Sequence, residues 1–72
     1  MDLVTIIVTV YNGENTIIST INSILKQTYT NIEIIIIDDY STDETWKIIN
    51  NIAKGDSRVK IYKNIVKGRA RA

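Results

Sequence analysis

Residues 32–45, IEIIIIDDYSTDET, carry the pattern that decides the fold. Four consecutive isoleucines predict a strand covered on both faces, as in a parallel sheet, because a half-exposed strand alternates apolar and polar residues. The strand ends at two adjacent carboxylates, Asp38 and Asp39. Ligands of such sheets bind beyond the carboxyl ends of the strands, and like charges side by side repel each other. We therefore expect at least one of the two to face a ligand.

Helix capping is a local explanation for the residues that follow the two carboxylates. Ser41, with Glu44 three residues later, reads as a capping box, and Asp43 suits the positive start of a helix. Capping leaves Asp38 and Asp39 unexplained.

A second strand-like run, from Leu3 to Val10, precedes this stretch and ends at the turn residues Tyr11-Asn12-Gly13. Between the two runs, apolar residues at helical spacing predict an amphipathic helix: Ile17, Ile18, Ile21, Ile24 and Leu25. A right-handed β-α-β crossover of this length makes the strands parallel neighbours. The Tyr11-Asn12 turn and the Asp38-Asp39 pair should then share one edge of the sheet.

An aromatic ring beside a carboxylate is the chemistry of a nucleotide pocket. Tyr11 can stack on a planar base, while a carboxylate accepts a hydrogen bond from an imide or amide N–H. The alternative is that the Tyr11 ring only packs against the core, which is the commoner role of an aromatic residue taken alone.

The remaining pattern predicts a second helix from Thr42 to Lys54, with Trp46 in the core and Gly55 as its stop. A short edge strand follows from Val59 to Tyr62. In a doubly wound sheet ordered 3-2-1, we expect the strand from Leu3 to Val10 to be an exposed edge, free of proline and charge, because the strand that should flank it is missing. This edge predicts a homodimer, formed by edge pairing or by exchange of the C-terminal segment.

Three motifs in order resemble the start of a family 2 glycosyltransferase with the GT-A fold: VTIIVTVYN at 4–12, INSILKQTY at 21–29 and IDDYSTDET at 37–45. The resemblance implies an α/β fold, a truncated Rossmann-like β-α-β-α-β unit with a three-stranded parallel sheet. Residues 1–72 would form part of a nucleotide-sugar-binding domain that takes a UDP-type donor. Two positions depart from the commonest family pattern, with Thr9 where proline is frequent and Tyr40 where glycine is frequent.

The resemblance also implies a set of nucleotide-binding residues, namely Thr9, Val10, Tyr11, Asn12, Glu14, Asp39 and Arg71. In this reading Tyr11 lies against the base, Asp39 contacts a uracil-type N–H, and Glu14 reaches toward the ribose. Arg71, in the segment Gly68-Arg69-Ala70-Arg71, would supply positive charge to the diphosphate. The alternative is that this basic segment is only a solvated tail. Asp38 would be structural and would not bind the ligand.

The same resemblance assigns no catalytic residue to this chain. The Asp-x-Asp motif that holds Mg²⁺ or Mn²⁺ on the donor diphosphate in the complete enzyme has no counterpart after residue 43. We therefore expect the catalytic half to be absent from these residues, and the chain by itself to transfer no sugar.

Composition excludes several other kinds of site. The chain has no cysteine and no histidine, which rules out disulfides, thiolate zinc sites and a histidine base. The net charge of +1 hides seven basic residues and one acid in 54–72, yet no extended basic face is expected, so nucleic acid is a poor partner. No signal peptide or membrane span is recognisable, which predicts a cytoplasmic protein.

Alternative functions fit the pattern less well. A phosphoryl-accepting receiver domain has its acid pair after the first strand, where this chain has Tyr11-Asn12. A calcium loop starting at Asp39 would need glycine at 44 and glutamate at 50, where the chain has Glu44 and Asn50. A non-catalytic nucleotide-binding or interaction fragment of the same fold remains the alternative to the enzyme reading.

Overall fold

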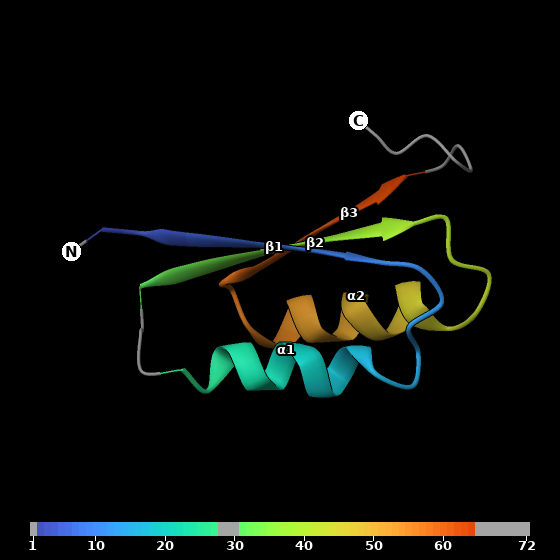
Figure 1. Cartoon of the computed structure of the whole chain (residues 1–72), viewed down its shortest axis with the longest axis horizontal. Coiled ribbons are helices and arrows are strands. Elements are labelled where there is room, and N and C mark those ends of the chain that lie inside the picture. Colours follow the sequence, from blue (N-terminus) through green and yellow to red (C-terminus); the bar gives the residue numbers. More distant parts are fainter. Residues whose placement is uncertain (1, 28–30, 65–72) are drawn as a thin grey trace.

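The structure is a computed structural model that describes residues 2–27 and 31–64. Its elements follow the order β1 (Val4–Val10), α1 (Ile17–Leu25), β2 (Ile32–Asp39), α2 (Thr45–Gly55) and β3 (Val59–Asn64). The three strands form one sheet in the order β1-β2-β3, and both pairs of neighbours run parallel (Figure 1). The predicted α/β class, with a truncated Rossmann-like β-α-β-α-β unit, is confirmed.

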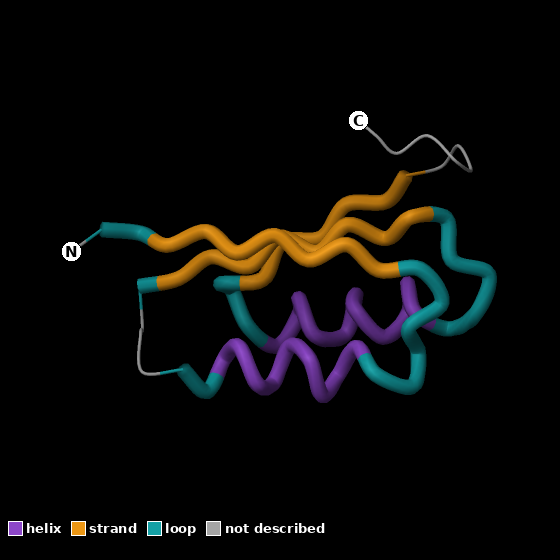
Figure 2. The backbone as a smooth tube through the Cα atoms, viewed as in Figure 1, coloured by secondary structure: helices purple, strands orange, loops and turns teal. Residues whose placement is uncertain are grey.

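Both helices lie on the same face of the sheet (Figures 1 and 2). Two right-handed crossovers that progress across the sheet in one direction place their helices on one side. The side chains of β2 accordingly alternate between buried and half-buried. Ile35 and Ile37 point to the face without helices, so the prediction that β2 is covered on both faces is wrong for the described residues.

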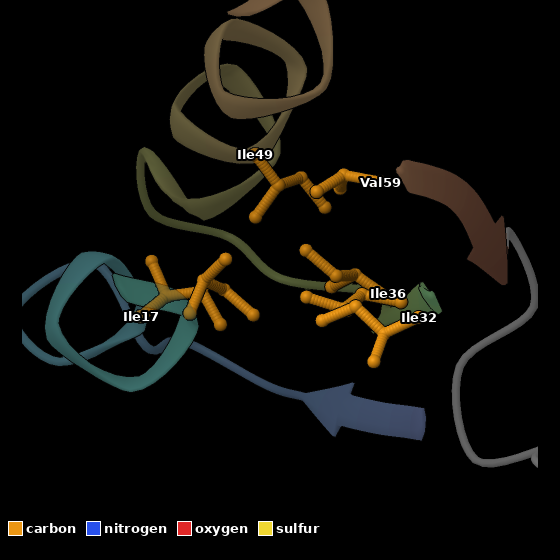
Figure 3. Close-up of a cluster of buried hydrophobic side chains, with 7 residues drawn as sticks. Ile17, Ile32, Ile36, Ile49 and Val59 are labelled. Carbon is orange, nitrogen blue, oxygen red and sulfur yellow. The ribbon is translucent and has the colours of Figure 1, made fainter. Parts of the chain in front are cut away.

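The core lies between the two helices and the covered face of the sheet (Figure 3). It consists of seven buried aliphatic side chains, Ile17, Ile21, Ile32, Ile34, Ile36, Ile49 and Val59. Trp46 is half-buried and packs against this cluster, as predicted, and the Lys63 ammonium lies 4.8 Å from the centre of its ring. Burying these side chains is the main force that holds the helices on the sheet.

Three local predictions differ from the structure. Ile18 was placed on the buried face of α1 but is 50% exposed, because the helix buries the stripe that contains Ile17 and Ile21. The second helix begins at Thr45, not at Thr42. Gly55 is the last residue of α2 and has no left-handed backbone, so its role as a stop does not depend on glycine's freedom at positive φ.

A tight turn leads from α2 into β3 at the amino ends of the strands. The Arg58 side chain donates two hydrogen bonds to Asp56, one of them in a 2.8 Å ion pair, and the Arg58 backbone N–H donates a third. These contacts lower the pKa of Asp56 from 3.8 to about 2, chiefly through the side-chain hydrogen bonds from Arg58. In the described part of the chain, neither helix is long and apolar enough to cross a membrane.

Candidate nucleotide site at the carboxyl edge of the sheet

Two loops meet where β1 and β2 end: residues 11–16 after β1 and residues 40–44 after β2 (Figure 1). The parallel register pairs Val10 with Asp38, so the residues that follow each strand emerge side by side. The sequence-based prediction that Tyr11-Asn12 and Asp38-Asp39 share one edge is therefore confirmed. The two loops are also joined directly by hydrogen bonds.

Asn12 is the centre of this joint. Its backbone has φ of 50°, in the left-handed region that asparagine tolerates better than most residues. Its side-chain Oδ1 accepts the backbone N–H of Thr42 at 2.8 Å and that of Asp43 at 3.3 Å. Its own N–H donates to Ser41 Oγ at 2.9 Å. Asn12 therefore joins the loop after β1 to the loop that leads into α2.

The amino end of α2 is capped from both loops. Asp43 Oδ1 accepts the Thr45 N–H at 2.9 Å, and the Glu44 N–H donates across to Glu14 Oε1 at 3.0 Å. The predicted capping box of Ser41 and Glu44 is not formed, because Ser41 turns back toward β2 and the Glu14 side chain takes over the Glu44 N–H. The cap of α2 is thus supplied partly by a residue thirty positions earlier.

The Asp43 carboxylate joins the loops from the other side. Its Oδ2 accepts the Glu14 N–H at 3.3 Å, and the Gly13 N–H donates to Thr45 Oγ1 at 2.9 Å. Burial opposes ionisation of Asp43, but the hydrogen bonds from Thr45 and Glu14 outweigh it and lower the pKa of this carboxyl. Gly13 has no room for a side chain, since a Cβ there would lie 2.6 Å from Val10 Cγ2.

Asp38 and Asp39 point to opposite faces of β2. Asp38 lies on the helix side, is completely buried, and accepts hydrogen bonds from both the N–H and the hydroxyl of Ser41. Its second oxygen, Oδ2, has no hydrogen-bond partner among residues 2–27 and 31–64. A buried carboxylate beneath the loop cannot reach a ligand in solvent, and this placement fits the structural role that the resemblance implied.

Asp39 lies on the face of the sheet without helices and is half-buried. Its Oδ1 accepts a hydrogen bond from Asn64 Nδ2 at 3.3 Å, and β3 holds Asn64 directly opposite Asp39 in the strand register. Tyr11, which continues β1 at the same edge, is 53% exposed. An accessible aromatic ring and a positioned carboxylate thus occupy one end of the sheet.

The structure separates the other predicted site residues into two groups. Thr9 is exposed on the same face as Asp39, since its register partner is Ile37. Val10 is half-buried on the helix side, and the side chains of Asn12 and Glu14 are engaged in joining the loops. Arg71 lies outside the described residues.

Sequence reasoning missed Asn64 as a member of this edge. Asn64 ends β3 beside Asp39, and a polar residue at the carboxyl end of the third strand was the signal that could have found it. The sequence predicts only a capping role for Ser41 and no role for Thr45, although each accepts a backbone hydrogen bond from the loop after β1.

The described residues do not fit the Mg²⁺ or Mn²⁺ site that the resemblance implies for the complete enzyme. They contain no group of three acidic side chains close enough to hold a metal ion. Asp38, Asp39 and Asp43 point to different partners, namely Ser41, Asn64 and Thr45. We assign no step to a metal in this part of the chain.

Comparison with known proteins gives the family. Residues 5–72 match the model of glycosyl transferase family 2, and the chain belongs to this family. Among curated relatives, it is 58% identical over 64 residues to the Escherichia coli protein UDP-Glc:alpha-D-GlcNAc-diphosphoundecaprenol beta-1,3-glucosyltransferase WfaP, a match that covers 89% of the chain and 25% of the relative.

Two further relatives are also named as glycosyltransferases. The Escherichia coli beta-1,3-glucosyltransferase WfgD, named for the same UDP-Glc donor, is 46% identical over 86% of the chain and 24% of its own length. Glycosyltransferase GlyG of Streptococcus pneumoniae is 39% identical over 96% of the chain and 23% of its own length. The chain therefore spans about a quarter of the length of these relatives.

Proposed function

We propose that the carboxyl edge of this sheet binds the nucleotide of a UDP-sugar donor, as one part of a glycosyltransferase site. The observation that carries the proposal is that the exposed Tyr11 ring, directly after β1, and the Asp39 carboxylate, at the end of β2, lie at the same edge of the sheet. Two relatives that carry UDP-Glc in their names support a uridine donor.

Each group has a defined task in this proposal. The Tyr11 ring stacks on the uracil, and Asp39 accepts a hydrogen bond from the uracil imide N–H. The Asn64 amide fixes one oxygen of Asp39, which orients the carboxylate before the ligand arrives. Thr9 lies on the same face and borders the pocket.

The joined loops support these two groups without touching the base. Asn12 and Glu14 hold the loop after β1 against the amino end of α2, so the backbone that carries Tyr11 is fixed from both sides. We assign Asn12 and Glu14 a positioning role on this evidence. Glu14 accepts the Glu44 N–H through Oε1, and its second oxygen, Oε2, is the atom that would reach a ribose hydroxyl.

In the whole protein we propose transfer of the sugar to an acceptor hydroxyl. The acceptor oxygen forms a bond to the anomeric carbon, the bond from that carbon to the diphosphate breaks, and UDP leaves. The hydroxyl proton passes to a general base. We place that base, and the groups that stabilise the leaving diphosphate, outside the described residues, so the 72-residue chain alone should neither transfer sugar nor hydrolyse the donor.

Titration with UDP and CDP, followed by amide NMR shifts, tests the site. Cytosine lacks the imide N–H, so UDP should bind more tightly than CDP and should shift the amides of Tyr11 and Asp39. Asp39→Asn should weaken UDP binding by about tenfold or more, because a charge-assisted hydrogen bond contributes about 1.5–3 kcal/mol. It should also abolish the preference for UDP, since an amide can donate to cytosine.

Asp38→Asn is the matched control, because it removes the same charge one residue away on the buried face. If the amide NMR spectrum of Asp38→Asn stays dispersed, which shows that this variant is folded, it should retain the preference for UDP over CDP. Equal affinity of the unmodified chain for UDP and CDP, or no shifts at about millimolar UDP, would overturn the assignment of Asp39.

A further inference from the structure

Asn64, at the end of β3, lies beside the carboxylate that the proposed function assigns to the base. It is half-buried, and its Nδ2 donates a hydrogen bond to Asp39 Oδ1 at 3.3 Å. A carboxamide nitrogen carries two hydrogens, and this bond uses one of them. Asn64 therefore brings a hydrogen-bond donor to the place where Asp39 would meet a ligand.

Three neighbouring strands end in a row of site residues. The register pairs Val10 with Asp38, so Tyr11, one residue further on, comes beside Asp39, and Asp39 is itself paired with Asn64. Neighbouring strands lie about 4.8 Å apart, which puts the whole row within about 10 Å. A base that stacks on Tyr11 and bonds to Asp39 therefore extends toward Asn64.

The hydrogen-bonding edge of uracil has a fixed order of groups. The imide N3–H is flanked by two carbonyl acceptors, O2 next to the nitrogen that carries the ribose and O4 on the side remote from the ribose. The proposed function assigns the ribose to Glu14, which like Tyr11 belongs to the loop after β1. The carbonyl on the β3 side of Asp39 is therefore O4.

We propose that Asn64 donates its second amide hydrogen to uracil O4, so that it reads the base in addition to orienting Asp39. This inference rests on the proposed function, because it takes a uridine nucleotide as the ligand. Asp39 then divides its two oxygens, with Oδ1 accepting from Asn64 and Oδ2 accepting from the uracil N3–H. Carboxylate, carboxamide and imide are all planar groups, so the three hydrogen bonds can lie in one plane.

The bond between the two side chains makes Asn64 selective for uracil over cytosine. Cytosine has an acceptor at N3 and an amino group at position 4, so it would place a lone pair against Asp39 and a donor against the Asn64 amino group. Rotating the Asn64 carboxamide by half a turn would offer its oxygen to cytosine, but would also break the bond to Asp39 and bring two oxygens together. The Asp39 carboxylate thus fixes Asn64 as a donor.

Titration of the unmodified chain and of Asn64→Ala with thio-substituted nucleotides tests this contact. Sulfur is a weaker acceptor than oxygen, so 4-thio-UDP should bind the unmodified chain about two- to tenfold more weakly than UDP, the range for one neutral hydrogen bond. In Asn64→Ala this difference should disappear, because no amide faces position 4. The analogue 2-thio-UDP, changed on the ribose side of the ring, should bind like UDP to both chains.

Asn51→Ala is the matched control, because Asn51 is exposed on α2 and loses the same carboxamide away from the site. This variant should keep the preference of the unmodified chain for UDP over 4-thio-UDP. The side-chain NH2 signals of Asn64 in the NMR spectrum of the unmodified chain give a measurement that needs no variant. UDP should shift these signals, and 4-thio-UDP at the same saturation should shift them less.

The possible failures are distinguishable. No binding of UDP to the unmodified chain would overturn the proposed function, and the role of Asn64 with it. A retained preference for UDP over CDP, with the same ratio of UDP to 4-thio-UDP affinity in Asn64→Ala and in the unmodified chain, would overturn the contact with O4 alone. Weaker binding of 2-thio-UDP in place of 4-thio-UDP would put Asn64 at O2 and likewise overturn the assignment to O4.

Discussion

Asn12→Ala should destabilise the protein by removing the acceptor that joins the two loops and by straining the backbone. The Asn12 carboxamide oxygen accepts two backbone N–H groups, those of Thr42 and Asp43. At the lower end of the usual range, because the loop is exposed, these bonds contribute together about 1–2 kcal/mol. Alanine at φ of 50° adds about 1 kcal/mol, which gives a total loss of about 2–3 kcal/mol.

Asn12→Gly separates the two contributions. Glycine also lacks the acceptor but adopts positive φ without strain, so Asn12→Gly should lose the two hydrogen bonds, about 1–2 kcal/mol, and none of the backbone strain. At an ordinary position alanine is more stable than glycine by about 0.4–1 kcal/mol, because glycine leaves the unfolded chain more freedom. The order of stability at residue 12 should be inverted, with glycine above alanine.

Urea unfolding followed by the fluorescence of Trp46, the single tryptophan, measures both variants. With a slope of about 1 kcal/mol per molar urea, a loss of 2 kcal/mol lowers the midpoint by about 2 M. All chains should be compared at one low concentration, so that association does not contribute. An Asn12→Ala midpoint equal to or above that of Asn12→Gly would refute the reasoning, since residue 12 would then not occupy the left-handed region.

Substitutions at four other positions test separate features of the fold. Tyr40 has φ of 62°, so Tyr40→Gly should be more stable than Tyr40→Ala by about 1 kcal/mol in urea unfolding, although both lose the ring; the reverse order would contradict a left-handed turn. Gly13→Ala should cost about 1–3 kcal/mol, because its methyl group would collide with a neighbouring valine side chain. In Gly55→Ala the added methyl group meets open space at a helix end, so this variant should be neutral or more stable by up to about 1 kcal/mol. Similar thermal midpoints for Gly13→Ala and Gly55→Ala would argue against the packing around residue 13. The hydrogen bonds from Arg58 lower the pKa of Asp56 from 3.8 to about 2, so the stability that they contribute is complete above pH 3.8 and is lost as the pH falls through 2. The stability of Asp56→Asn should therefore fall less steeply over this range. The same pH dependence in Asp56→Asn and in the unmodified chain would show that the contact does not stabilise the fold.

The sequence by itself determined the order of the elements and the edge of the sheet at which the candidate site lies. Isoleucine runs and helical spacing are local signals, and a connection of about twenty residues between parallel strands permits only a crossover through a helix. The placement of Tyr11 and the Asp38-Asp39 pair at one edge of the sheet followed from that topology alone, and the register of Val10 with Asp38 confirms it.

The tertiary structure decided which of the two aspartates is accessible. Alternation along a strand places Asp38 and Asp39 on opposite faces, but only the position of the helices shows that Asp38 is the buried one. A run of isoleucines looks the same whether one face or both faces are covered. For this reason the open face of β2, with Ile35 and Ile37, could not be read from composition.

The hydrogen bonds between the two loops also could not be predicted from the sequence. The capping box was predicted from residues three positions apart, whereas the caps that form at α2 include the Glu14 side chain, thirty positions from the Glu44 N–H. Local patterns report only on neighbours along the chain. Which distant donor meets which acceptor depends on how closely the packed helices and sheet bring the two loops together, and this distance exists only in the folded molecule.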